Sequence, residues 1–372
     1  MATLAGNTIA STYALLLKID NTGIAGDGTL RKVEDGDATD SALSLSDVSI
    51  AVDATDKIFL DGGTHSYIHE SASDVVQIVA GGTVVFEGDT NSRISLSNND
   101  SGADNTVFGF LAGANLASGG DDNTLIGDYA GNALTVSDNN VAIGSGAMNL
   151  ADGANVAGNV AIGTSALDAA MTYGSEIAIG YGSMGVWTGA GDGNDAKGYN
   201  VAIGFGALDT EQSGRYNIAI GADALGDQAN TDNPDTYNIG IGQDAGRCIT
   251  TGTQNIFIGG LSGGTGASTL TGAGNTCVGY NSGNDLTGAG HSNTLIGVNA
   301  GATVTTGYDN TLIGDGATPS AVGGNNQTVI GEGALGVDNN YAVIGNTNTE
   351  RLYAASDGDA VVYCGGINMS NN

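Results

Sequence analysis

The chain has 372 residues, of which 64 are Gly, 2 are Pro and 13% are charged, and its formal net charge is −31. Gly does not recur at every third position, which excludes a collagen-like helix, and Val, Ile and Leu recur in register, which disfavours disorder. So acidic a surface repels phosphate backbones and anionic lipids, so we expect no nucleic-acid binding. Met1–Leu17 lacks a basic region before an apolar stretch, and no apolar run approaches the length of a membrane span, so we expect no secretory signal and no membrane insertion.

Two N-terminal segments precede the main part of the chain. Residues 1–35 contain a short apolar stretch, Tyr13–Ile19, and five of the nine basic residues lie before position 94. We interpret 1–35 as a segment that attaches the chain to a particle or to another fibre, with an ordinary folded cap as the alternative. Residues 36–104 alternate in the manner of strands, as in Asp74–Ala80, which predicts short antiparallel β-hairpins that form a stalk.

Residues 105–345 repeat one short motif fourteen times: a turn-forming polar residue, three mainly apolar residues, and Gly. Successive motif glycines are 14 to 24 residues apart, and the usual spacing is 17 to 20. A regular period with one short strand per unit is typical of a parallel β-solenoid, here of about 14 coils. At about 4.8 Å per coil, such a solenoid is a rod on the order of 65 to 70 Å long. The clearest repeat residues are Asn123, Ile126, Gly127, Asn140, Ile143, Gly144, Asn217, Ile220, Gly221, Asn310, Ile313 and Gly314.

The position of a residue in the motif predicts its environment. The residue before the motif glycine is large and apolar in all fourteen units, and the residue three before it is Val, Ile or Thr in thirteen. Because side chains alternate along a strand, these two share a face, which we expect to line the inside of the coil. The residue between them is also apolar, and often small, as in Ala142 and Ala219. A strand that is apolar on both faces is buried on both, so we expect a homo-oligomer around an axis, with a sandwich within one chain as the alternative.

Two further positions predict the turns. Asn stands four residues before the motif glycine in eleven units, which predicts a ladder of stacked amides that also satisfies backbone groups of the turns. The residue three after the glycine is Ala or Ser in thirteen units, which predicts a tight corner. The motif glycine itself is expected to supply a positive φ or to avoid a clash.

These motifs resemble the head repeats of trimeric autotransporter adhesins (YadA-like heads), whose units read Asn-x-x-x-Ile/Val-Gly followed by a small residue. The resemblance covers residues 105–345. It implies an all-β fold in which a left-handed parallel β-roll assembles into a homotrimeric fibre. The spacing in this chain exceeds the coil length of those heads, so longer turns are expected.

Other segments resemble parts of bacteriophage tail-fibre proteins. The runs Gly6–Tyr13, Asp40–Ser46 and Asp61–Ser71 are similar to N-terminal parts and short β-stalk modules of such fibres. The run Val343–Ala354 resembles the segment that precedes a self-cleaving chaperone domain in related fibres, and no such domain is expected in this chain. We interpret residues 346–372 as a C-terminal cap that covers the open end of the solenoid.

The resemblances predict a structural virion protein, a homotrimeric tail fibre that attaches to a host surface through loops on the β-roll. Its expected partners are two further copies, a virion or baseplate protein bound through 1–35, and a host cell-surface glycan or protein. The expected localisation is the virion. A bacterial cell-surface adhesin or an extracellular filament subunit is the alternative, although we find none of the signal peptide, coiled-coil stalk and membrane anchor of those adhesins.

Chemistry is weakly indicated. Glycan hydrolysis needs two carboxylates about 5 to 10 Å apart, and turn acids such as Asp128, Asp315 and Glu332 would lie near others. Forty acidic residues create such neighbours by chance, and none of the three His belongs to a nucleophile constellation. We therefore expect no enzyme, and a polysaccharide depolymerase is the less favoured alternative.

Metal and thiol chemistry are also weakly indicated. The turns Gly119–Asp122 and Asp232–Asp235 offer oxygen ligands for Ca²⁺, but the Gly-Gly-x-Gly-x-Asp pattern of calcium-binding β-rolls does not recur, so we expect no cofactor, with Ca²⁺ as the alternative. Cys248, Cys277 and Cys364 have no metal-ligand spacing and imply no disulfide framework. Cys277 lies within a strand motif, where we expect a small buried apolar side chain.

The candidate receptor-binding residues are Trp187, Tyr199 and Tyr237. The longest interval between motif glycines contains Trp187, the single Trp of the chain, and Tyr199, and the second longest contains Tyr237. Aromatic side chains on extended loops suit stacking on sugars or contact with a partner. The alternative for Trp187 is that its ring folds back onto the solenoid.

Overall fold

The computed structural model describes residues 104–349, except 154–155, 170, 172–173, 189–197, 232–233 and 265–268, and parts of the chain between residues 18 and 95. The chain divides into two compact units, residues 1–101 and 102–372. Every regular element among the described residues is a β-strand, which confirms the predicted all-β fold. The described residues therefore contain no helix that is long and apolar enough to cross a membrane.

The N-terminal unit contains two antiparallel sheets whose strands follow one another in chain order. A four-stranded sheet comprises β1 (Lys18–Ile19), β2 (Arg31–Glu34), β3 (Asp40–Leu45) and β4 (Ile50–Val52). A five-stranded sheet comprises β5 (Lys57–Phe59), β6 (Tyr67–Ala72), β7 (Val75–Ala80), β8 (Thr83–Gly88) and β9 (Ile94–Ser95). The β2–β3 pairing joins the segments expected on either side of residue 35. The stalk role and the attachment role of these segments stay predictions.

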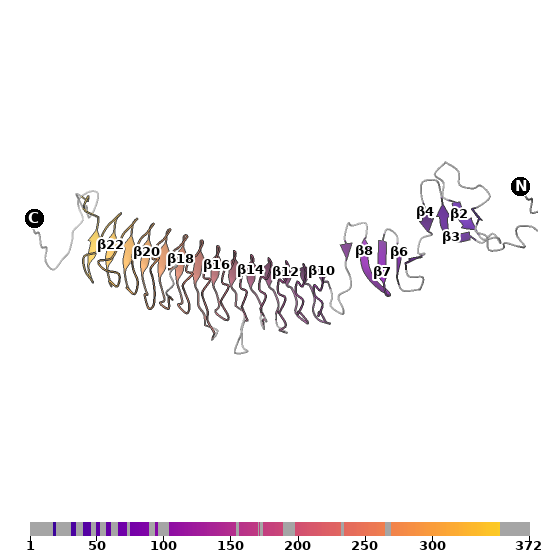
Figure 1. The fold of residues 1–372 in the computed structure, drawn as a ribbon, viewed down its shortest axis with the longest axis horizontal. Helices are drawn as coiled ribbons and strands as arrows, with labels where there is room; N and C mark the ends of the chain where they lie inside the picture. Colours follow the sequence, from indigo (N-terminus) through magenta and orange to yellow (C-terminus); the bar gives the residue numbers. More distant parts are fainter. Residues whose placement is uncertain are drawn as a thin grey trace, which may run out of the picture. The chain divides into compact units, whose positions relative to one another are not determined.

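The second unit is a parallel β-solenoid, as predicted. Its fourteen three-residue strands form one parallel sheet in strict chain order, so they close about thirteen turns (Figure 1). The strands are β10 (Thr106–Phe108), β11 (Thr124–Ile126), β12 (Val141–Ile143), β13 (Val160–Ile162), β14 (Ile177–Ile179), β15 (Val201–Ile203), β16 (Ile218–Ile220), β17 (Ile239–Ile241), β18 (Ile256–Ile258), β19 (Thr276–Val278), β20 (Thr294–Ile296), β21 (Thr311–Ile313), β22 (Thr328–Ile330) and β23 (Ala342–Ile344). Equivalent motif residues pair from strand to strand, for example Ala142 with Ala161. The left hand of the roll stays a prediction, and most of the expected cap, residues 350–372, lies outside the described residues.

The two faces of the sheet are assigned the opposite way from the sequence prediction. The middle residue of each strand points inward: Leu125 and Ala142 have no exposed surface. The first and third residues, such as Val141 and Ile143, point outward and stay partly exposed. The prediction was wrong because alternation separates two faces without saying which is inside, and because larger apolar side chains were assumed to be interior. Size does not decide the face either, since both Leu125 and Ala142 lie inside.

Two positions of each coil share the interior space: the inward residue of the strand and the residue four after the motif glycine. In several coils one of them is small and the other is large. Ala142 is the inward residue of β12, and Met148, four residues after the motif glycine, fills the space beside it. In the coil of β11 the inward residue is Leu125 and the equivalent fourth position is Gly131. A Cβ atom at Gly131 would lie 2.7 Å from Leu125 Cδ2, closer than packed atoms approach. The remaining coils from β13 to β16 repeat the small-then-large pattern, with Ala161 and Leu167, Ala178 and Met184, Ala202 and Leu208, and Ala219 and Leu225.

The predicted amide ladder is confirmed. From Asn123 to Gln327, each residue at the motif-asparagine position donates its backbone N–H to the side-chain oxygen of the residue one coil earlier, at 2.8 to 3.2 Å. The amide groups also serve the turns, since Asn140 Nδ2 donates to the Val156 carbonyl at 2.8 Å. The buried amide groups of this row are therefore hydrogen-bonded from coil to coil, as buried polar groups require.

The role predicted for the motif glycines is confirmed at each corner. Gly127 and Gly144 have φ of 135° and 134°, in the region that favours glycine. A Cβ atom at Gly144 would lie 2.6 Å from the carbonyl carbon of Gly163 in the next coil. The backbone of each such glycine thus lies directly against the backbone of the motif glycine in the next coil. The small residue three positions later, such as Ala147, is fully buried in the corner that was expected there.

Candidate interaction surface

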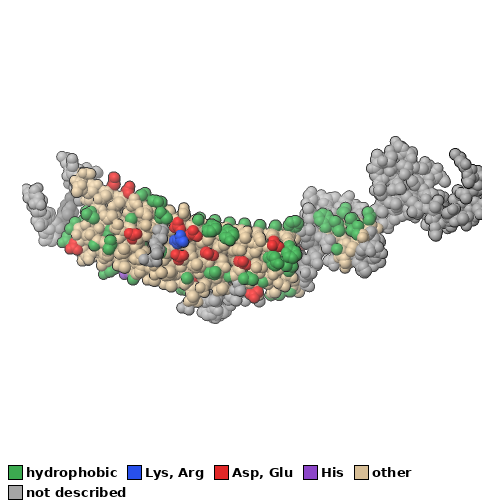
Figure 2. All heavy atoms as spheres, in the orientation of Figure 1, with side chains coloured by type: hydrophobic (Ala, Val, Ile, Leu, Met, Phe, Trp, Pro, Cys, Tyr) green, Lys and Arg blue, Asp and Glu red, His purple; other side chains and the backbone are tan. Residues whose placement is uncertain are grey.

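The outward side of β10–β23, here called the sheet face, is an uncharged and mainly apolar surface that runs along the described solenoid. It consists of the first and third residues of the fourteen strands, 28 positions in all. None is charged: 21 are Ile, Val or Phe, six are Thr and one is Ala. Figure 2 shows the hydrophobic side chains as a row along the margin where Figure 1 places β10–β16. In a chain with a net charge of −31, this uncharged strip is a candidate contact surface.

The size of the sheet face fits a protein contact. Thirteen strand spacings of about 4.8 Å and a width of three residues give roughly 60 Å by 10 Å, on the order of 600 Å². An exposed apolar patch of that size is at the upper limit for a monomer, and a standard interface buries about 800 Å² per partner. The sheet face supplies most of that area, and the residues at its two margins can supply the rest.

One margin, here called the Asn edge, lies where the strands begin, beside the amide ladder. Three successive coils place a tyrosine there, immediately before the ladder asparagine: Tyr199, Tyr216 and Tyr237. Their rings are stacked nearly parallel, with centroids 5.6 Å apart for the first pair and 5.0 Å for the second. All three are exposed, and Tyr199 and Tyr237 keep 44% and 47% of their surface accessible. These coils therefore carry a row of tyrosines along the solenoid.

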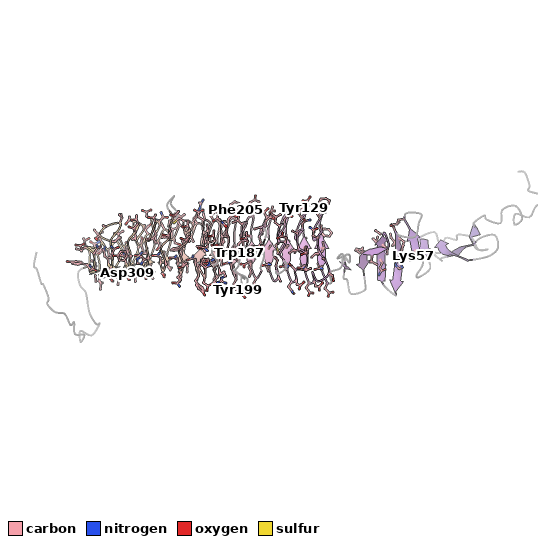
Figure 3. The ribbon with its side chains drawn as sticks, turned by 90° about the horizontal axis from the view of Figure 1, so that it is seen from below. Lys57, Tyr129, Trp187, Tyr199, Phe205 and Asp309 are labelled. Atoms are coloured by element: carbon pink, nitrogen blue, oxygen red, sulfur yellow. The ribbon has the colours of Figure 1, made fainter. Side chains whose placement is uncertain are left out.

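The opposite margin, here called the Gly edge, lies where the strands end. Its aromatic residues directly follow motif glycines, and Tyr181 and Phe205 on neighbouring coils stack with centroids 5.6 Å apart. Phe205 is 58% exposed. Figure 3 places Tyr199 and Phe205 at opposite sides of the solenoid, although both flank β15. The sheet face is thus bordered by aromatic side chains on both sides at β15, with Tyr181 one coil before on the Gly edge and Tyr216 and Tyr237 on the next two coils of the Asn edge.

Trp187 does not lie on this surface. Its side chain is 1% exposed and belongs to the interior, where a Cβ atom at Gly198 would lie 2.5 Å from its Cζ2 atom. It stands seven residues after the motif glycine, the position that Leu116 and Leu134 fill in earlier coils. That periodic position was the sequence signal for burial. The receptor-contact prediction for Trp187 is therefore corrected: the indole packs the interior and has no free face for a sugar.

Tyr199 and Tyr237 are brought together by a residue that the sequence analysis missed. Tyr216 stacks between them, and it could have been found because all three precede an Asn of the repeat. Beside this row, Arg215 Nη2 pairs with Asp235 Oδ1 at 2.7 Å. The ion pair uses an oxygen of one of the two turns that were considered for Ca²⁺. Among the described residues, no three His, Cys, Asp or Glu side chains converge as metal ligands.

Two fully buried carboxylates, Glu176 and Glu211, lie in the coils of β14 and β15 and differ in their partners. Glu176 replaces a ladder asparagine, and burial raises the pKa of its carboxyl to about 8. Its Oε2 accepts from the Asn200 N–H at 2.9 Å, while its Oε1 and Trp187 Nε1 have no hydrogen-bond partner within the described part of the chain. Glu211 instead accepts five hydrogen bonds, from the backbone of Ser213, Gly214 and Asn230 and from the side chains of Gln228 and Asn230.

The other candidates for chemistry remain dispersed. Asp315 and Glu332 occupy the same exposed position of neighbouring coils on the Gly edge, and Asp128 has that position far along the sheet. Cys277 is fully buried, as predicted, and its burial raises the thiol pKa. Burial likewise raises the pKa of Cys248 to about 11, so neither thiol is a nucleophile at neutral pH.

Comparison with known proteins adds no relative. No model of a protein family matches the chain, and no curated protein sequence matches it either. The sheet face, its edges and the resemblance of the repeats are therefore the features that bear on function.

Proposed function

We propose that the chain is the subunit of a homotrimeric virion tail fibre, in which the β-roll displays loops that attach to a host surface. The observation that supports this proposal is the uncharged sheet face of β10–β23. In water, an apolar β-surface of this length is stabilised when a second apolar layer covers it. The proposal therefore keeps the expected oligomer and moves its interface to the Ile, Val and Thr side of the sheet.

A second copy of the chain is the occupant that fits the sheet face best. The outward side chains recur once per coil, at about 4.8 Å, along fourteen strands. A partner must repeat at the same interval to fill the spaces between these rows, and another copy does so. A ring of copies around an axis parallel to the solenoid covers every sheet face and leaves no open contact. Three copies is the number that the resemblance implies.

The oligomer is tested by the mass of the native protein in multi-angle light scattering. We expect roughly three times the chain mass of 36.7 kDa. The paired substitution Ile203→Glu and Ile220→Glu places charge on the sheet face and should shift the mass towards the monomer, because a desolvated carboxylate without a partner is costly. Val322→Glu, at an exposed turn position, is the matched control and should leave the mass unchanged. A monomer for the unsubstituted chain would contradict the proposal.

The virion role is tested by imaging. An antibody to residues 105–345 should label projecting fibres on whole virus particles. Label on a bacterial envelope would instead support the alternative, a cell-surface adhesin or extracellular filament subunit. Purified protein should bind intact host cells, and periodate treatment of the cells separates a glycan receptor from a protein receptor. We propose no catalysis by the fibre, and the appearance of new reducing ends in host polysaccharide would overturn that part.

Host contact is proposed for the loops of the two longest coils. Of the three aromatic candidates, Trp187 is interior and is no longer proposed as a receptor contact. Tyr199 and Tyr237 are exposed, but they border the sheet face. Most of the first loop, residues 189–197, and part of the second, 232–233, lie outside the described residues. Replacing loop residues 189–197 by a short Gly-Ser segment should abolish binding to cells while the oligomer persists.

A further inference from the structure

We propose that aromatic side chains form the seams between neighbouring copies: the Asn edge of one copy packs against the Gly edge of the next, and Tyr199 meets Phe205 at the level of β15. This inference rests on the proposed function, because it requires sheet faces that turn towards a shared axis. It adds the residues of the seam, and it makes the copies parallel and in register. It also assigns Tyr199 and Tyr237 to contact between copies and away from the receptor.

The tyrosine row and the pair Tyr181 and Phe205, the two aromatic clusters, lie at overlapping levels along the solenoid. Tyr199 precedes β15 and Phe205 follows the same strand, so the two clusters overlap at the level of β15 on opposite edges (Figure 3). Any rotation about an axis parallel to the solenoid brings the Asn edge of one copy to the Gly edge of the next at an unchanged level. A twofold axis perpendicular to the solenoid would bring like edges together with the order of coils reversed. The aromatic clusters therefore meet in the parallel ring.

The side chains that face each other in this ring are complementary in size. At β14 the Gly edge carries Tyr181 and the Asn edge carries Ser175. At β16 the sizes are exchanged, because the Asn edge carries Tyr216 and the Gly edge carries Ala222. A large ring thus meets a small residue on either side of the level of β15, where two rings meet. Alternation of large and small residues across a contact is how packed layers interdigitate.

The edge positions that would meet in this ring carry no charge. Between β14 and β16, no charged residue occupies the last position of the Asn edge or the first position of the Gly edge. The cation nearest the row in sequence, Arg215, is paired with Asp235. Buried contact cores between proteins are depleted of charge and enriched in Tyr and Phe. The edge positions of these coils therefore have the composition of an interface in a chain that is strongly acidic as a whole.

Cross-linking between cysteines tests the pairing of the edges. In a Cys364→Ser background, the full chain carries Tyr199→Cys and Phe205→Cys and is treated with a short bismaleimide, because ring contact leaves the Cα atoms further apart than a disulfide spans. Cys248 and Cys277 are buried and should not react. We expect a covalent trimer from the double variant and only monomers from each single variant. Cross-linking of either single variant would show that like edges meet and would overturn the inference.

Light scattering separates this failure from that of the proposed function. A monomeric protein would contradict the homotrimer itself. A trimer that the double variant does not cross-link would leave the homotrimer standing and remove the seam.

Exchange of sizes at β16 provides a second test. Ala222→Tyr alone places two rings opposite each other and should raise the dissociation constant of the oligomer by roughly tenfold or more. Tyr216→Ala combined with Ala222→Tyr moves the ring to the other edge and should restore the constant to within about threefold. Within one chain the two residues lie on opposite edges, so rescue requires contact between copies. An equal loss in the single and the double variant would contradict the seam.

Discussion

The backbone N–H of Asn200 donates to Oε2 of Glu176 at 2.9 Å, at the one place where a carboxylate replaces an amide inside the described ladder. Asparagines at this position offer an oxygen to the next coil and an N–H to their own surroundings. A carboxylate offers only oxygens unless it is protonated, and Glu176 Oε1 has no partner within the described residues. The ladder thus continues through Glu176 at the cost of burying an acid.

We predict that Glu176 makes stability depend on pH. Its folded-state pKa, about 8, is above the ordinary value of 4.5, because burial disfavours the charged form. A raised pKa means that the contribution to stability is complete below pH 4.5 and is lost as the pH rises through 8. The expected slope between these values is about 1.4 kcal/mol per pH unit. Melting temperatures at pH 5, 7 and 9 should converge when Glu176→Asn restores the amide.

The matched control for this prediction is Glu211→Gln. Glu211 is equally buried but accepts five hydrogen bonds, so an amide in its place turns N–H groups towards N–H donors such as Gln228 Nε2. That variant should melt earlier than the unsubstituted chain at every pH. An unchanged pH profile for Glu176→Asn would show that Glu176 does not titrate in the folded protein.

The second prediction concerns the volume shared by Ala142 and Met148. Ala142→Leu should overpack the coil and Met148→Gly should leave a cavity, each at a cost of about 2 kcal/mol. The double variant copies the Leu125 and Gly131 arrangement of the preceding coil and should recover most of the loss. Chemical denaturation of the four proteins gives the coupling. Additive losses would contradict the shared volume.

The third prediction compares two neighbouring glycines. Gly144→Ala places a Cβ atom against the backbone of Gly163 and should destabilise the protein by about 2 kcal/mol or more. Gly146 also has positive φ, 68°, but no backbone lies within 4 Å of an added Cβ atom. Asn occupies the position of Gly146 in two other coils, as Asn281 and Asn299. Gly146→Asn should therefore cost less than about 1 kcal/mol, and equal losses in thermal denaturation would refute the stacked-corner explanation.

The fourth prediction concerns salt. Asp122 and Asp128 flank β11, and Asp309 and Asp315 flank β21, so a parallel ring brings acid to acid between copies at two levels. Added salt screens this repulsion, and we expect tighter association as ionic strength rises. Asp128→Asn should weaken the salt dependence, whereas Asp285→Asn, an exposed acid in a turn away from both edges, should change it less. Sedimentation between 0.05 and 0.5 M salt, about one decade, measures the effect.

Much of the solenoid could be predicted because the repeated motif contains the residues that form its strands, its ladder and its corners. The spacing of the motif glycines predicted the number and order of the strands. The recurrence of Asn at one position of the motif, as at Asn123 and Asn140, predicted the ladder. The recurrence of Gly, as at Gly127 and Gly144, predicted the corners in the same way. The faces of the strands were predicted wrongly. Val141, Ala142 and Ile143 are all apolar, and the alternation of side chains along a strand does not say which face is inside. Trp187 was misplaced because the length of its loop outweighed its periodic position.

The sequence by itself determined the strand period, the parallel stacking and the ladder, because each depends on one residue type that returns at a fixed interval. Only the tertiary structure decided which side of the sheet is inside, because that depends on the width of a coil and on which distant residue fills it. Met148 fills the space beside Ala142, and so the Ile and Val side chains remain outside. The stacking of Tyr199, Tyr216 and Tyr237 was likewise decided in three dimensions, since neighbours on a solenoid are one coil apart and not one residue apart.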